Sequence, residues 1–73
     1  MKQKAKDLQT RIMEMTGCEA MYCVALGQIQ LHNPSKEKIW HAIKMLKHMG
    51  ELKFDTCERK MDGEYVAVFH LAA

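Results

Sequence analysis

The sequence predicts one α+β domain in which helices pack against a C-terminal β-hairpin. Two observations predict it. Apolar residues between Ile39 and Leu46 recur at three- and four-residue steps, which is the period of a helix. From Leu52 onward, apolar and polar residues alternate, and Asp62-Gly63 interrupts the alternation as a turn between two strands would. A chain of 73 residues leaves room for a single domain, covering residues 1–73.

The first segment is expected to be a helix from Lys2 to Thr16, because strong helix formers dominate it. Gly17 follows directly, and glycine commonly ends a helix. The buried stripe of this helix is expected from the residues at helical spacing, namely Ala5, Leu8, Ile12 and Met15.

The segment from Glu19 to Leu31 contains a nearly continuous apolar run that fits two periods. Met21, Ala25 and Ile29 have the spacing of residues on one side of a helix. Tyr22, Val24 and Leu26 have the spacing of residues on one face of a strand. We favour a second helix here, and a short strand over Ala20–Leu26 remains the alternative.

A third helix is expected to begin after His32-Asn33-Pro34-Ser35 and to run to about Met49. Asn33 or Ser35 can cap its first turn, and Pro34 suits the first helical position. Its core side is predicted to hold Ile39, Ala42, Ile43, Leu46 and Met49. The opposite side holds Glu37, His41, Lys44 and His48, and the shoulder holds Lys36, Trp40 and Lys47.

The hairpin is expected to turn one face toward the helices, composed of Leu52, Phe54, Thr56, Tyr65, Ala67, Phe69 and Leu71. Val66 and Val68 make its other face unusually apolar. We expect that face to be covered by the Tyr22 region as a third strand, or by another copy of the protein.

The spacing of Ile39, Ile43, Leu46, Gly50 and Leu52 resembles the recognition helix and wing of the winged helix-turn-helix family. The resemblance covers about half of the chain. It implies three helices with a C-terminal hairpin wing, and double-stranded DNA as the partner, with the third helix in the major groove. Similarity to small transcriptional regulators of bacteria and their phages implies a homodimer.

The residues expected at or beside DNA come from this helix and from the hairpin tip. They are Lys36, Trp40, His41, Lys44, Lys47, Arg59 and Lys60. Trp40 is also expected to pack partly into the core. A net charge of only +2 and the carboxylate of Glu37 oppose strong binding to phosphate.

The alternative to DNA binding is a winged-helix module that binds or inhibits another protein. The low net charge favours it, and its surface would consist of Val66, Val68 and Trp40. DNA binding is the hypothesis that we favour.

Other classes of function fit the sequence poorly. Cys18 and Cys23 are separated by four residues and no second ligand pair follows, so we expect no metal and no cofactor. No nucleophile with a base and no phosphate-binding glycine loop is present, so we expect no enzyme activity. The three cysteines are an odd number, and no apolar run is long enough to span a bilayer. We therefore expect a cytoplasmic protein outside the membrane.

Overall fold

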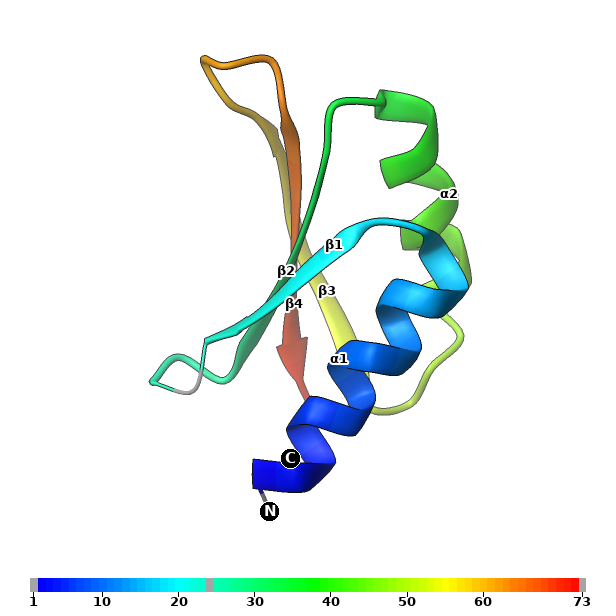
Figure 1. The fold of residues 1–73 in the computed structure, drawn as a ribbon, viewed down its shortest axis with the longest axis vertical. Coiled ribbons are helices and arrows are strands. Elements are labelled where there is room, and N and C mark those ends of the chain that lie inside the picture. The colour runs from blue at the N-terminus through cyan, green and yellow to red at the C-terminus, as the bar shows by residue number, and fades with distance from the viewer. Residues whose placement is uncertain (1, 24, 73) are drawn as a thin grey trace.

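The computed structural model describes residues 2–23 and 25–72, which form two helices and a four-stranded antiparallel sheet (Figure 1). The strand order is β1-β2-β4-β3. The elements along the chain are α1 (Lys2–Thr16), β1 (Glu19–Cys23), β2 (Gln28–Asn33), α2 (Lys36–Leu46), β3 (Leu52–Arg59) and β4 (Tyr65–Leu71). The fold is therefore α+β, but the expected winged helix with three helices and a C-terminal wing is wrong.

Helix α1 has the bounds that the sequence predicts. Leu8 and Ile12 are buried, whereas Met15 is 46% exposed and does not belong to the buried stripe. Met15 lies in the last turn of the helix. The side chain of Ala5 lies outside the described residues. Gly17 ends the helix at φ 70°, and its N–H donates to the carbonyl of Met13 at 2.9 Å.

The expected second helix is wrong, because this segment forms the β1–β2 hairpin. The strands pair from Glu19 opposite His32 to Cys23 opposite Gln28, and Gly27 takes φ 61° in the turn between them. Ala20 is buried among the core residues, as are Ile29 and Leu31 of β2. Val24, one residue of the strand alternative, lies outside the described part of the chain. Ala20, Ile29 and Leu31 lie on one face of the sheet, under the helices. The strand alternative is right only as far as Cys23: Tyr22 packs against the core, whereas Leu26 is 63% exposed in the turn.

Helix α2 corresponds to the helix that was expected third, and it begins at the predicted cap. The Ser35 hydroxyl accepts from the N–H of Lys38 at 3.3 Å, and the Asn33 side chain accepts from the N–H of Ser35 at 2.8 Å. The helix ends at Leu46, before Met49. Its buried residues are Ile39, Ala42, Ile43 and Leu46, as predicted.

Strands β3 and β4 form the predicted hairpin, but β3 contains a register shift between Phe54 and Thr56. This bulge inserts one residue, so the face assignment changes beyond it. Cys57 rather than Thr56 joins Phe54 on the helix side and packs against the core. The Asp55 carboxylate lies 2.7 Å from His70 Nε2.

Strand β2 pairs with β4 and thereby joins the two hairpins into one sheet. The register runs from Gln28 opposite His70 to Asn33 opposite Tyr65. The Tyr22 region thus extends the sheet sideways and does not cover the Val66 face, so the first of the two expected covers is wrong. Cover by another copy of the protein stays a prediction. Val66 is nevertheless only 4% exposed, although it lies outside the core cluster under the helices.

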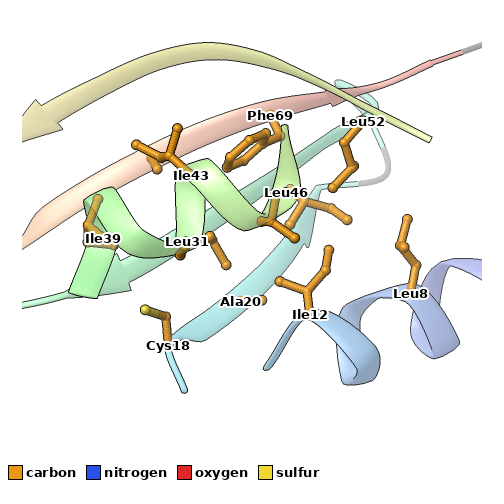
Figure 2. Close-up of a cluster of buried hydrophobic side chains, with 13 residues drawn as sticks. Leu8, Ile12, Cys18, Ala20, Leu31, Ile39, Ile43, Leu46, Leu52 and Phe69 are labelled. Carbon is orange, nitrogen blue, oxygen red and sulfur yellow. The ribbon is translucent and has the colours of Figure 1, made fainter. Parts of the chain in front are cut away.

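Both helices lie on the same face of the sheet (Figure 1). Helix α1 packs against β1 and α2, and α2 packs across β2 and β4. Figure 2 shows the core between them, where Ile43 and Leu46 of α2 lie close to Phe69 of β4. Within the described residues, no helix is long and apolar enough to cross a membrane.

Replacing Ile43 or Leu46 by alanine should lower the free energy of unfolding by about 2–5 kcal/mol, because each leaves a cavity in this core. Lys44→Ala on the exposed side should change it by less than about 0.5 kcal/mol. Urea titration followed by circular dichroism measures the three values. Equal and small changes at all three positions would contradict the packing of α2.

The turn between β3 and β4 should depend on Gly63, which has φ 92°. A Cβ at this position would meet nothing within 4 Å, so only the backbone conformation resists a side chain. Gly63→Val should therefore cost about 1–3 kcal/mol. Hydrogen exchange should show faster exchange at the Lys60 and Gly63 amides, which donate across the turn. Unchanged protection of these amides would contradict the assignment.

Candidate functional site

The exposed side of α2 presents one stripe of long side chains. Lys36, Trp40 and Lys44 follow at four-residue steps, so they lie one helical turn apart on the same side. Glu37 and His41 form the neighbouring stripe. These five residues line an open hollow of about 500 Å³ on the surface of the helix.

Helix α2 and the two residues that follow it are net positive. Segment 36–48 contains four lysines and one acidic residue, a net charge of +3, whereas the whole chain carries +2. The rest of the chain is therefore net negative by one charge. All four lysines are exposed. Lys36, Lys44 and Lys47 lie toward the hollow and the flank beside β3, whereas Lys38 lies on the other flank of α2.

Trp40 is not one of the buried core residues, although just over half of it is covered by neighbouring atoms. Its side chain is 46% exposed. It is absent both from the buried cluster and from the partly buried residues that pack against that cluster. A tryptophan in this position leaves a large apolar surface in water, which is the usual property of a residue that anchors a ligand or partner.

Two cysteines lie near opposite flanks of α2. Burial raises the pKa of the Cys57 thiol on β3, and the charge of Lys36 partly offsets that rise. Burial likewise raises the pKa of Cys18, where the Thr16 hydrogen bond and the charge of Lys38 act in the opposite direction. The Lys36 flank of α2 therefore faces β3, and the Lys38 flank faces the start of β1.

Trp40 and Lys47 belong to the flank that faces β3. A helix turns by about 100° per residue, which places Lys36, Trp40 and Lys47 within about 40° of one another around the axis. Strand β3 is the edge strand beyond β4, outside the two strands on which α2 packs. This flank of α2 is consequently open.

The hairpin tip lies at the end of the molecule where α2 begins (Figure 1). Arg59 follows Cys57 by two residues on β3 and so shares its helix-side face. Lys60 is in the turn, where its N–H donates to the carbonyl of Glu64 at 2.7 Å. Arg59 therefore adds a positive charge on the side of β3 toward α2, although Glu58, Asp62 and Glu64 outnumber Arg59 and Lys60 and give segment 58–64 a net charge of −1.

The structure brings together four of the seven residues expected at DNA, which are Lys36, Trp40, His41 and Lys44 around the hollow. Lys47 is the exposed C-cap residue of the same helix. Arg59 and Lys60 lie at the adjacent tip. Sequence reasoning missed the proximity of Cys57 to Lys36, because the β-bulge that turns Cys57 toward α2 has no sequence signal of its own.

The surface expected for a protein partner is not continuous. Val66 and Val68 alternate with the core residues Ala67 and Phe69, so they lie on the face of the sheet away from the helices. Trp40 is on α2, on the opposite side of that sheet. Val66 is also buried. These three residues cannot contact one partner surface together.

A second hollow contains an ion pair between two of its lining residues. This hollow, of about 530 Å³, is lined by Asp7, Thr10, Arg11 and Glu51, and Arg11 and Glu51 form the ion pair across it at 3.3 Å. Among the described residues, no three His, Cys, Asp or Glu side chains lie close enough together to hold a metal ion. The hollow on α2 is therefore the strongest candidate site.

Comparison with known proteins finds no family model, no curated protein and no solved structure that matches this chain. The function must therefore be inferred from the charge, exposure and geometry of the α2 surface itself.

Reactivity of Cys57 should report the proximity of Lys36. Lys36→Gln removes the charge that lowers the Cys57 pKa, so that pKa should rise further and alkylation by iodoacetamide at a fixed, mildly alkaline pH should slow. Mass spectrometry of the modified peptides measures the rate at each cysteine. Lys38→Gln is the matched control and should leave Cys57 unchanged. Equal slowing by both variants would contradict the placement of Lys36 beside β3.

Proposed function

We propose that this protein binds double-stranded DNA through the exposed face of α2, with the β3–β4 tip on phosphate, and acts as a small transcriptional regulator. The observation that carries the proposal is the net charge of +3 on segment 36–48, in a chain whose remainder is net negative. Arg59 adds a further positive charge beyond the helix.

The lysines would supply the sequence-independent part of binding. Ammonium groups that neutralise phosphates release counterions, and this release provides most of the affinity for DNA of any sequence. Lys36 and Lys44 flank the hollow, and Lys47 extends the row by a further turn. Arg59 and Lys60 would hold the backbone next to the groove that α2 occupies.

Helix α2 has the dimensions for a major groove. Its 11 residues span about 16 Å, and the major groove is about 12 Å wide and admits one helix. The apolar side of α2 is already used against β2 and β4, so the polar side is free to face base edges. In this proposal α2 is the helix that enters the major groove, a position that the family resemblance implied for a third helix.

Glu37 and His41 are the groups in the hollow best suited to base edges. A carboxylate near phosphate repels it, but a carboxylate in the major groove can accept from the amino group of cytosine. Glu37 also lies in the first turn of α2, where the helix dipole favours a negative charge. His41, one turn further along, can donate to a purine.

A homodimer would strengthen such binding, because a single helix of this length reaches only a few base pairs and a second copy would add another half-site. The cytoplasm is the location that fits DNA binding, and an odd number of cysteines favours a reducing compartment.

Salt dependence of DNA affinity tests this proposal. Lys36→Ala, Lys44→Ala and the double variant Arg59→Ala/Lys60→Ala should each weaken binding to every duplex. Each should also reduce the slope of log K against log salt by about 0.9 for every phosphate that the variant no longer neutralises. Fluorescence anisotropy of a labelled duplex measures the affinity between about 50 and 200 mM salt.

Lys53→Ala is the matched control, because Lys53 is exposed and pairs with His70 on the face of the sheet away from α2. It removes the same charge and should leave the slope unchanged. A wild-type protein that fails to bind any duplex at about 50 mM salt, where attraction to phosphate is strong, would overturn the proposal.

A further inference from the structure

Trp40 is the only tryptophan of the chain, and it is not a member of the buried core cluster. Nearly half of it is exposed to solvent. Lys36 and Lys44 stand one turn before and one turn after it on the same stripe of α2. An aromatic surface between two positive charges is thus presented to solvent.

We infer that Trp40 stacks on an unpaired base of DNA while Lys36 and Lys44 hold the phosphates on either side. The protein should accordingly prefer DNA that contains unpaired bases over fully paired duplex. This inference rests on the proposed function, because it takes the α2 face as the DNA-binding surface, and it names the form of DNA that the face favours.

The chemistry of the hollow matches that of a nucleotide. An indole ring and a base are both flat and apolar on their faces, and stacking between them tolerates any base sequence. Successive turns of α2 are about 5.4 Å apart, so the flexible lysine chains can place ammonium groups beside the ring without leaving the helix. Positive charge combined with an exposed aromatic side chain is the usual composition of a single-strand binding surface.

Base pairing decides between the two forms of DNA. In a paired duplex each base is stacked between its neighbours, so Trp40 would meet only base edges and the backbone. An unpaired base exposes a full aromatic face to the ring and also frees its Watson–Crick edge. Glu37 and His41 line the same hollow and can accept from and donate to that edge.

Tryptophan fluorescence tests the inference directly, since all of the signal comes from Trp40. Oligothymidine of about 16 nucleotides, a length that covers a typical single-strand site, is titrated against the protein. The same strand annealed to oligodeoxyadenosine is titrated in parallel. We expect strong quenching by the single strand and little by the duplex, together with tighter binding of the single strand by anisotropy.

Substitutions separate stacking from charge. Trp40→Leu should weaken single-strand binding about 5- to 150-fold, the range expected when one base no longer stacks, and should lower the ratio of single-strand affinity to duplex affinity. Trp40→Phe should retain part of the preference, because it keeps an aromatic ring. Lys53→Ala should change neither affinity. Circular dichroism should show that all three variants remain folded, since Trp40 is outside the core.

The outcomes that would overturn the inference are distinct. Equal affinity for both forms of DNA with no quenching overturns stacking at Trp40 and leaves the proposed function standing. No binding of either form overturns both. Quenching by polyglutamate but by neither DNA also overturns the inference, because it would show that the basic surface of α2 binds an acidic polypeptide.

Discussion

The pairing of β2 with β4 is the constraint on which the rest of this structure depends. Each hairpin pairs strands that are neighbours in the chain. Strands β2 and β4 are instead separated by α2 and β3, and they pair without a connecting turn. Ile29 and Leu31 on one strand and Phe69 on the other are completely buried beside each other. Helix α2 packs over this pair, so the same contact closes the sheet and positions the helix.

This arrangement determines which side of α2 is left for function. The apolar residues of the helix occupy the side toward β2 and β4, and the stripe of Lys36, Trp40 and Lys44 runs along the flank next to that side. Because β3 lies beyond β4 without a helix above it, one flank of α2 also remains open. Trp40 and the charged residues around it are therefore exposed because other residues of α2 fill the core.

The sheet has two edges, and both carry features that hinder pairing with another strand. At β1, the Gln9 side chain donates to the carbonyl of Ala20 at 2.8 Å and occupies a backbone acceptor. At β3, the bulge near Asp55 disrupts the regular ladder, and Lys53 adds a charge. Such devices are common on edge strands and oppose extension of the sheet. They make the helical surface a better place for a partner than the strand edges.

Sequence alone was sufficient for α1, for α2 and for the β3–β4 hairpin. In each case the signal is local: helical spacing that stops at Gly17, a cap at Ser35, and a turn at Asp62-Gly63. The basic residues of α2 were also visible, because a helix whose apolar stripe is known has a known opposite side. Most of the candidate site followed from that single periodicity.

Only the tertiary structure decided the segment from Glu19 to Asn33, the bulge in β3 and the position of Trp40. The apolar run of this segment fits both a helix and a strand. Which of the two forms depends on whether β4 is available to pair with β2, and β4 is distant in the sequence. The extra residue of a bulge has no local composition that marks it. The exposure of Trp40 likewise depends on which elements surround α2. The helical spacing of the apolar residues in α2 cannot show that neither helix packs over β3, the strand on that flank.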